Sequence, residues 1–172
     1  MVYNGCEVEE SGRKWNKPKN HEKRWKVLLI GEYEHSIDTK GRLIMPSKLK
    51  DDIGEKFVIT KGLDGCLFVY SQKEWQNFEE KLRAFPLTNK DARALMRFFL
   101  AGAMECEIDK QGRFLIAGNL REFAGLEKEV VIIGVLNKIE IWSKDKWLEY
   151  SKEENNEADE IAEKMANLNL GI

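Results

Sequence analysis

The chain has 172 residues, of which 42% are hydrophobic and 34% charged, as in an ordinary globular domain rather than a disordered chain. No apolar stretch reaches the roughly 18 residues that cross a membrane, and the net charge of −2 excludes a generally basic protein, so any anion-binding surface must be local. Three scattered cysteines (Cys6, Cys66 and Cys106) and only two histidines exclude a disulfide framework and a histidine metal centre, and we expect no metal and no cofactor.

Residues 1–27 show neither helical nor strand periodicity, and residues 1–31 are expected to be a disordered leader. The basic stretch at residues 11–20 also fits an arm that wraps nucleic acid. A third interpretation is a start codon assigned too far upstream. Residues 23–25 can be encoded by a purine-rich ribosome-binding sequence, and Leu28 or Leu29 by the start codon TTG.

Residues 32–74 are expected to form a first structural unit. From Glu32, apolar and polar residues alternate, which predicts a half-buried strand. Asp38 and Gly41 predict a tight turn, because Asp bonds its downstream backbone and Gly accepts the left-handed conformation. The remaining expected elements are a return strand (42–45), a helix from Pro46-Ser47 to Gly54, strands at 57–60 and 66–70, and an amphipathic helix (73–82).

Residues 75–102 are expected to be a helical connector between this unit and the next. Thr88 followed by Asp91 predicts a capping box at a helix start. The helix should bury an apolar stripe. The stripe consists of Ala92, Leu95, Met96, Phe99 and Leu100.

Residues 103–146 repeat the first unit. The segment Ile37–Ile44 returns as Ile108–Leu115, 71 residues later, and the downstream strands and Trp75 also return. Two copies suit a pseudo-symmetric pair in which each half completes the core of the other. We expect both copies to bury the same apolar positions, namely Ile37, Ile44, Ile108 and Leu115.

The second copy departs from the first at its short helix and is followed by an acidic end. Ala117-Gly118 replaces Pro46-Ser47, which predicts a weaker helix start. Residues 147–172 are expected to form a C-terminal helix and an acidic tail, with residues 153–168 a marginal helix or a frayed end.

No nucleophile, base and acid form a catalytic set, and the chain is not expected to be an enzyme. Asp38 and Asp109 could be read as paired carboxylates, but their turn-initiating positions explain them structurally. The aromatic residues stand at strand and helix spacings that suit a core better than base stacking.

Arg42 and Arg113 have no such structural explanation. Each follows its turn glycine, where a permanently charged fork can donate to a phosphate or a guanine edge. The alternative is that each arginine pairs with the Asp of its own turn, and both interpretations stay open. Further cations stand within a few residues of the two turns, namely Lys40, Lys48, Lys50, Lys110 and Arg121.

The two ordered copies of Asp-x-x-Gly-Arg, at Asp38–Arg42 and Asp109–Arg113, resemble the MraZ family of bacterial transcriptional regulators. The similarity extends through residues 60–70 and 134–142 and covers 29 to about 150. It implies an α+β, mainly β fold, in which tandem SpoVT/AbrB-like repeats form one pseudo-symmetric swapped-hairpin β-barrel with short flanking helices.

The resemblance also implies a function. Members form rings and bind direct repeats of double-stranded DNA in the promoter of a division and cell-wall gene cluster that includes their own gene, with repression expected here. The family's DNA-contacting arginine falls on Arg42, and Arg113 occupies the equivalent place. We expect a cytoplasmic, nucleoid-associated homo-oligomer with no membrane partner and no small-molecule substrate. The rivals are a ring-forming interaction scaffold that binds no DNA and a small enzyme.

Overall fold

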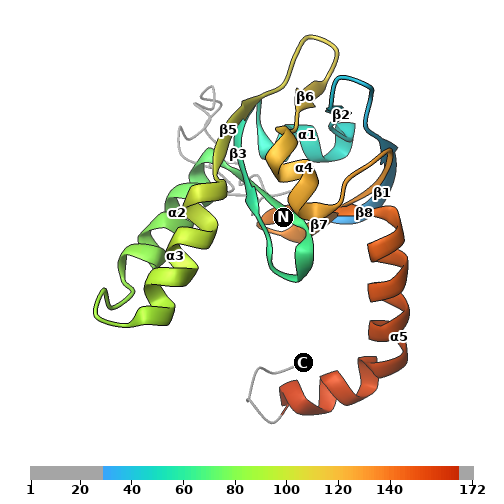
Figure 1. The fold of residues 1–172 in the computed structure, drawn as a ribbon. Helices are drawn as coiled ribbons and strands as arrows, with labels where there is room; N and C mark the ends of the chain where they lie inside the picture. The colour runs from blue at the N-terminus through green and yellow to red at the C-terminus, as the bar shows by residue number, and fades with distance from the viewer. Residues whose placement is uncertain (1–28, 167–172) are drawn as a thin grey trace, which may run out of the picture.

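Apart from one 3-10 turn found in the first copy, the two sequence copies fold into equivalent elements in the same order (Figure 1). The structure is a computed structural model that describes residues 29–166. The first copy contains β1 (Leu29–Ser36), β2 (Arg42–Ile44), α1 (Ser47–Ile53), β3 (Lys56–Lys61), the 3-10 turn η1 (Leu63–Gly65) and β4 (Leu67–Ser71). The second contains β5 (Met104–Glu107), β6 (Arg113–Leu115), α4 (Gly118–Ala124), β7 (Glu129–Leu136) and β8 (Lys138–Ser143). Helices α2 (Gln72–Arg83) and α3 (Lys90–Gly102) join the copies, and α5 (Lys144–Ala166) follows β8.

Strands of the two copies interleave. The larger sheet has the order β1-β7-β8-β4-β3-β5, and β2 pairs with β6 in a separate two-stranded ribbon. The order is unchanged when every strand is exchanged for its copy and the sheet is read from the other end. Phe68 lies opposite its own counterpart Glu140, and Leu43 opposite its counterpart Phe114. A pseudo-two-fold axis therefore relates the copies through these two pairs, and neither copy has a complete sheet alone.

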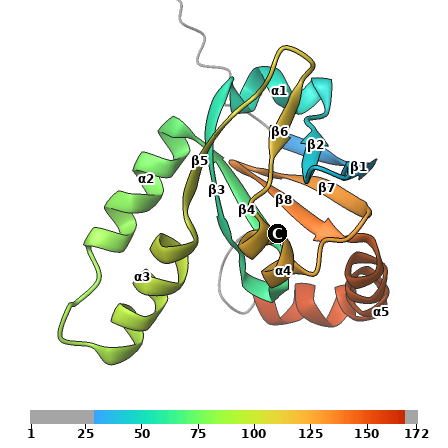
Figure 2. The ribbon, with the colours of Figure 1, turned by 45° about the horizontal axis from the view of Figure 1, so that its top comes forward.

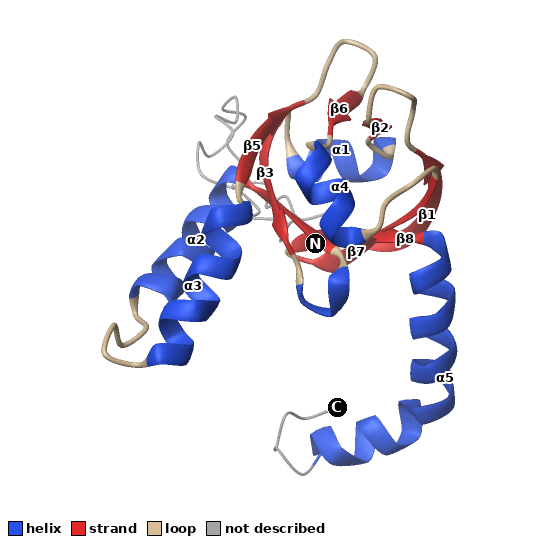
Figure 3. Ribbon diagram, in the orientation of Figure 1, coloured by secondary structure: helices blue, strands red, loops and turns tan. Residues whose placement is uncertain are grey.

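The larger sheet stays open, so the expected closed barrel is not observed. Its edges are β1 and β5, and neither pairs with the ribbon within residues 29–166. The ribbon strands are three residues long and, within the described residues, pair with each other and not with the edges of the larger sheet. The mixed α+β fold dominated by strands is confirmed, as a curved sheet whose concave side is covered by the ribbon, α1 and α4 (Figure 3).

The ribbon buries a different pair of residues from the one expected. Leu43 and Phe114 point inward and are almost fully buried, with the Phe114 ring edge-on to Phe57 at 5.1 Å. Ile44 and Leu115 are 48% and 54% exposed, so the prediction that they belong to the core is wrong. Successive strand residues face opposite sides, and both sides carry an apolar residue here, so the alternation does not say which one is buried. The other two expected core positions, Ile37 and Ile108, are buried.

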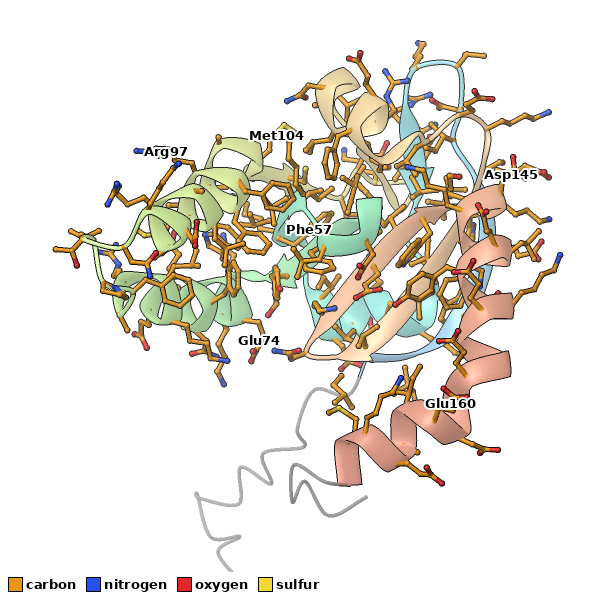
Figure 4. All side chains as sticks on the ribbon, turned by 60° about the horizontal axis from the view of Figure 1, so that its bottom comes forward. Phe57, Glu74, Arg97, Met104, Asp145 and Glu160 are labelled. Carbon is orange, nitrogen blue, oxygen red and sulfur yellow. The ribbon has the colours of Figure 1, made fainter. Side chains whose placement is uncertain are left out.

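A second, aromatic cluster joins the larger sheet to α2 and α3, which lie side by side as a helical hairpin (Figure 2). Tyr70 stacks on Phe78 at 5.2 Å, and Phe78 meets Phe99 edge-on at 5.0 Å. Thr60 anchors the hairpin, because its buried hydroxyl donates to the carbonyl of Phe99 at 2.6 Å. Figure 4 shows side chains filling the space between this hairpin and the sheet. The interpretation of these aromatic residues as core is confirmed.

Three expected boundaries are corrected. Strand β1 begins at Leu29, inside the expected leader, because the Leu29 side chain is buried in the core; residues 1–28 lie outside the described part. Asn89, not Thr88, caps α3, because its side-chain oxygen accepts the backbone N–H groups of Asp91 and Ala92. Helix α5 runs without a break into the expected acidic end, of which residues 167–172 lie outside the description.

Candidate nucleic-acid interface

The two turns have the same geometry, which begins with the aspartate. Asp38 Oδ1 accepts the backbone N–H groups of Lys40 and Arg42, both at 2.9 Å. The Gly41 N–H donates to the Asp38 carbonyl at 2.9 Å, and Gly41 has a φ of 80°, in the left-handed region that favours glycine. The expected role of Asp and Gly in closing the turn is therefore observed. The second turn repeats these bonds from Asp109 to Arg113.

Each arginine is paired with the aspartate of its own turn. The Arg42 Nε donates to Asp38 Oδ2 at 2.7 Å, and Arg113 Nε to Asp109 Oδ2 at 2.9 Å. The hydrogen bonds from these arginines lower the pKa of both carboxyl groups to about 2. The pairing left open by the sequence thus occurs in both copies. It does not bury the arginine side chains, which keep 30% and 26% exposure.

The pairing of β2 with β6 brings the two arginines onto one surface. Arg42 lies opposite Leu115, and Ile44 lies opposite Arg113. Because Leu43 and Phe114 point inward, these four residues form the outer face of the ribbon. Each arginine therefore stands beside an exposed aliphatic side chain. We call this surface, made of Arg42, Ile44, Arg113 and Leu115, the ribbon face.

A groove beside the ribbon collects three of the predicted lysines from both copies. Lys48 and Lys50 belong to α1 of the first copy, whereas Lys110 belongs to the turn of the second. They line a groove of about 590 Å³ together with Tyr33 and His35 of β1. The sequence did not identify Tyr33 and His35 as site residues. Their alternation with polar neighbours predicted that they share one face of a strand, but it did not predict that this face lines a groove with Lys110.

Lys40 and Arg121 differ from these lysines. Lys40 is exposed at the tip of the first turn. Arg121 of α4 turns inward, where its Nε donates to the carbonyl of Ile116 at 3.1 Å and its guanidinium lies over Gly41. The structure therefore groups Arg42, Arg113 and the lysines near one end of the fold, with Arg121 packed beneath the first turn.

The charge of this region departs from that of the whole chain. From each turn to the end of the short helix that follows it, Lys and Arg exceed Asp and Glu by one (four against three over 38–53, three against two over 109–124), whereas the chain has a net charge of −2. A local positive surface is what an anion-binding site in a near-neutral protein requires. Between residues 29 and 166, no three His, Cys, Asp or Glu side chains gather as a metal site. None of the helices described there has the length and hydropathy needed to cross a bilayer.

Comparison with known proteins agrees with this architecture. The family model for the MraZ protein matches twice in succession, over residues 28–98 and 99–169. Proteins named "Transcriptional regulator MraZ" from Caldanaerobacter subterraneus subsp. tengcongensis, Acetivibrio thermocellus and Clostridium beijerinckii are 61%, 60% and 59% identical to the chain. Each match spans 143 residues, which is 83% of this chain and the whole of the relative. The chain belongs to the MraZ family.

Proposed function

We propose that the chain is a sequence-specific DNA-binding transcriptional regulator that contacts double-stranded DNA through the ribbon face. The observation that carries this proposal is the pairing of β2 with β6, which presents Arg42 and Arg113 on one surface. The charge of the surrounding segments and the names of the relatives support it.

The ribbon has the size and chemistry for base recognition. A two-stranded β-ribbon fits the major groove, where arginine donates to guanine and an aliphatic side chain contacts the thymine methyl group. Asp38 holds Arg42 through Nε and Nη2, so the side chain meets DNA already oriented and loses little conformational freedom on binding. Ile44 and Leu115 supply the aliphatic contacts beside the arginines. Lys40, Lys48, Lys50 and Lys110 bind backbone phosphates, which position the protein without specifying sequence.

The proposed target is a set of direct repeats in the promoter of a division and cell-wall gene cluster that includes the chain's own gene, with repression as the outcome. The proposed assembly is a ring of identical chains. Several ribbon faces on one ring would bind several repeats at once, and the linked contacts would raise the overall affinity. This part of the proposal rests on the Asp-x-x-Gly-Arg resemblance. Analytical ultracentrifugation at micromolar concentration tests it, since a single 20.0 kDa species would overturn the ring.

An electrophoretic mobility shift with the gene's upstream DNA, repeated over a salt series, tests DNA binding. We expect Arg42→Ala and Arg113→Ala each to weaken binding by about 1–3 kcal/mol per contacting chain. Arg97→Ala is the matched control, because Arg97 is exposed on α3, away from the ribbon (Figure 4). If Arg42→Ala and Arg113→Ala both bind DNA as tightly as the parent, the ribbon face is not the DNA-binding surface. No shift by the parent at any salt concentration would instead favour the scaffold function.

A further inference from the structure

The pseudo-symmetry of the two copies fails at the groove beside the ribbon. On one side, α1 and the second turn form the groove of about 590 Å³. The pseudo-equivalent place on the other side lies between α4 and the first turn. The three lysines of the first side, Lys48, Lys50 and Lys110, are replaced there by Asn119, Arg121 and Thr39.

The Arg121 side chain occupies the pseudo-equivalent position between α4 and the first turn. A Cβ atom built on Gly41 would lie 3.0 Å from Arg121 Cζ and Nε, so the guanidinium is in close contact with the first turn. A Cβ built on Gly112, the equivalent glycine, would meet nothing within 4 Å. Arg121 is also held by its bond to the Ile116 carbonyl. The two places therefore differ, because the groove is open beside Gly112, whereas the Arg121 side chain occupies the space beside Gly41.

The open groove suits a chain of phosphates. It carries three lysines from two different elements, and none of the lining residues that the structure describes is acidic. Lysine ammonium groups are mobile point charges that bind phosphate without demanding one fixed geometry. On the other side, which we call the closed side, Arg121 is partly exposed but bonded to the Ile116 carbonyl, and Lys40 stands where the groove has Gln111.

We infer that the open groove holds backbone phosphates of one DNA strand while the closed side contributes only Lys40 at the turn beside the ribbon, so that each chain lies on the duplex in one fixed direction. The inference rests on the proposed function, since the ribbon face must first contact DNA. A protein with equal grooves on both sides of its axis would bind a duplex equally well in either direction, as dimers do on palindromic sites. Phosphate binding on one side only makes the two directions of binding unequal. Such a protein suits DNA sites that all have the same orientation.

Two measurements on the full chain test the inference. The first is the salt dependence of binding for Lys48→Gln, Lys50→Gln and Lys110→Gln, each of which should reduce the slope of log K against log salt by about 0.9. Arg121→Gln is the matched closed-side variant and should leave the slope unchanged; urea unfolding of each variant checks that it remains folded. Unchanged slopes in all three lysine variants would overturn the inference.

The second measurement is phosphate-ethylation interference on operator DNA. We expect interfering phosphates beyond the ribbon contacts on one flank of each repeat only, and we expect Lys50→Gln to abolish that flank. Interference that is symmetric about each repeat would overturn the fixed direction. Loss of affinity in Arg42→Ala with no effect of the lysine variants would leave DNA binding standing and refute only this inference. Absence of binding by the parent would refute the proposed function and this inference with it.

Discussion

The Asp38 carboxylate binds Arg42 three times: Oδ1 accepts its backbone N–H at 2.9 Å, and Oδ2 accepts Nε and Nη2, both at 2.7 Å. One side chain thus closes the turn and orients the arginine. The Asp109–Arg113 pair does the same in the second copy. Both carboxylates are occupied by these bonds, which argues for a structural role and against acid–base chemistry.

The first prediction concerns acid stability. Because the arginine bonds lower the folded-state pKa of Asp38 and Asp109 from 3.8 to about 2, the unfolded chain binds more protons between these values. The two carboxylates therefore stabilise the fold fully above about pH 4, and this contribution is lost as pH falls towards 2. We expect the stability difference between the parent and Asp38→Asn/Asp109→Asn, measured by urea unfolding, to shrink across this interval. A difference that stays constant from pH 5 to pH 2 would contradict the assignment.

The second prediction compares the two turn glycines. Gly41→Ala and Gly112→Ala place an alanine at nearly the same positive φ, 80° and 78°, at a shared cost of about 1–2 kcal/mol. Gly41→Ala should cost more, because its methyl group would press on the Arg121 guanidinium. Chemical denaturation measures both, and adding Arg121→Ala should abolish the difference. Equal losses of unfolding free energy in the two single variants would contradict this prediction, because they would show that the Arg121 side chain moves aside at no cost.

The third prediction tests which face of the ribbon is buried. Leu43→Ala and Phe114→Ala should destabilise the fold by about 2–5 kcal/mol, because each leaves a cavity. Ile44→Ser and Leu115→Ser should change stability by about 0.5 kcal/mol or less, since both side chains are largely exposed. Urea unfolding measures the stability of all four variants. A large loss of stability in the serine variants would show that Ile44 and Leu115, not Leu43 and Phe114, are buried. With stability intact, weaker operator binding by the serine variants would support their place on the ribbon face.

The fourth prediction concerns the separated copies. The pairings β1–β7, β2–β6, β3–β5 and β4–β8 each join the two copies, so a single copy leaves these strand edges unpaired. A fragment of residues 29–82 should therefore be unfolded or dimeric. Circular dichroism and analytical ultracentrifugation check this outcome. A folded monomer of that fragment would show that the interleaving is dispensable.

Local sequence patterns predicted most helices and strands correctly. The predictions that were wrong concern choices between neighbouring residues that local patterns cannot make. Asp38 and Gly41 were correctly placed in a turn, since their effects act within four residues of chain. Thr88 was expected to cap α3 because Asp91 stands three residues later, but Asn89 is also a good N-cap residue, and its side-chain oxygen accepts the free N–H groups of the helix. The expected burial of Ile44 failed because packing against the sheet selects Leu43 instead.

The sequence by itself determined the repeat and the two Asp–Gly turns, because these turns depend on an aspartate side chain bonding to backbone a few residues away, whereas it left the Asp–Arg pairing open. Only the tertiary structure decided that β2 pairs with β6, that Lys48 and Lys110 line one groove, and that the Arg121 side chain lies against Gly41. Each of these contacts joins segments some 60 to 80 residues apart in the chain. Hydrophobic burial drives such segments together without directional preference, so the register and neighbours of each side chain emerge only when the whole core is packed.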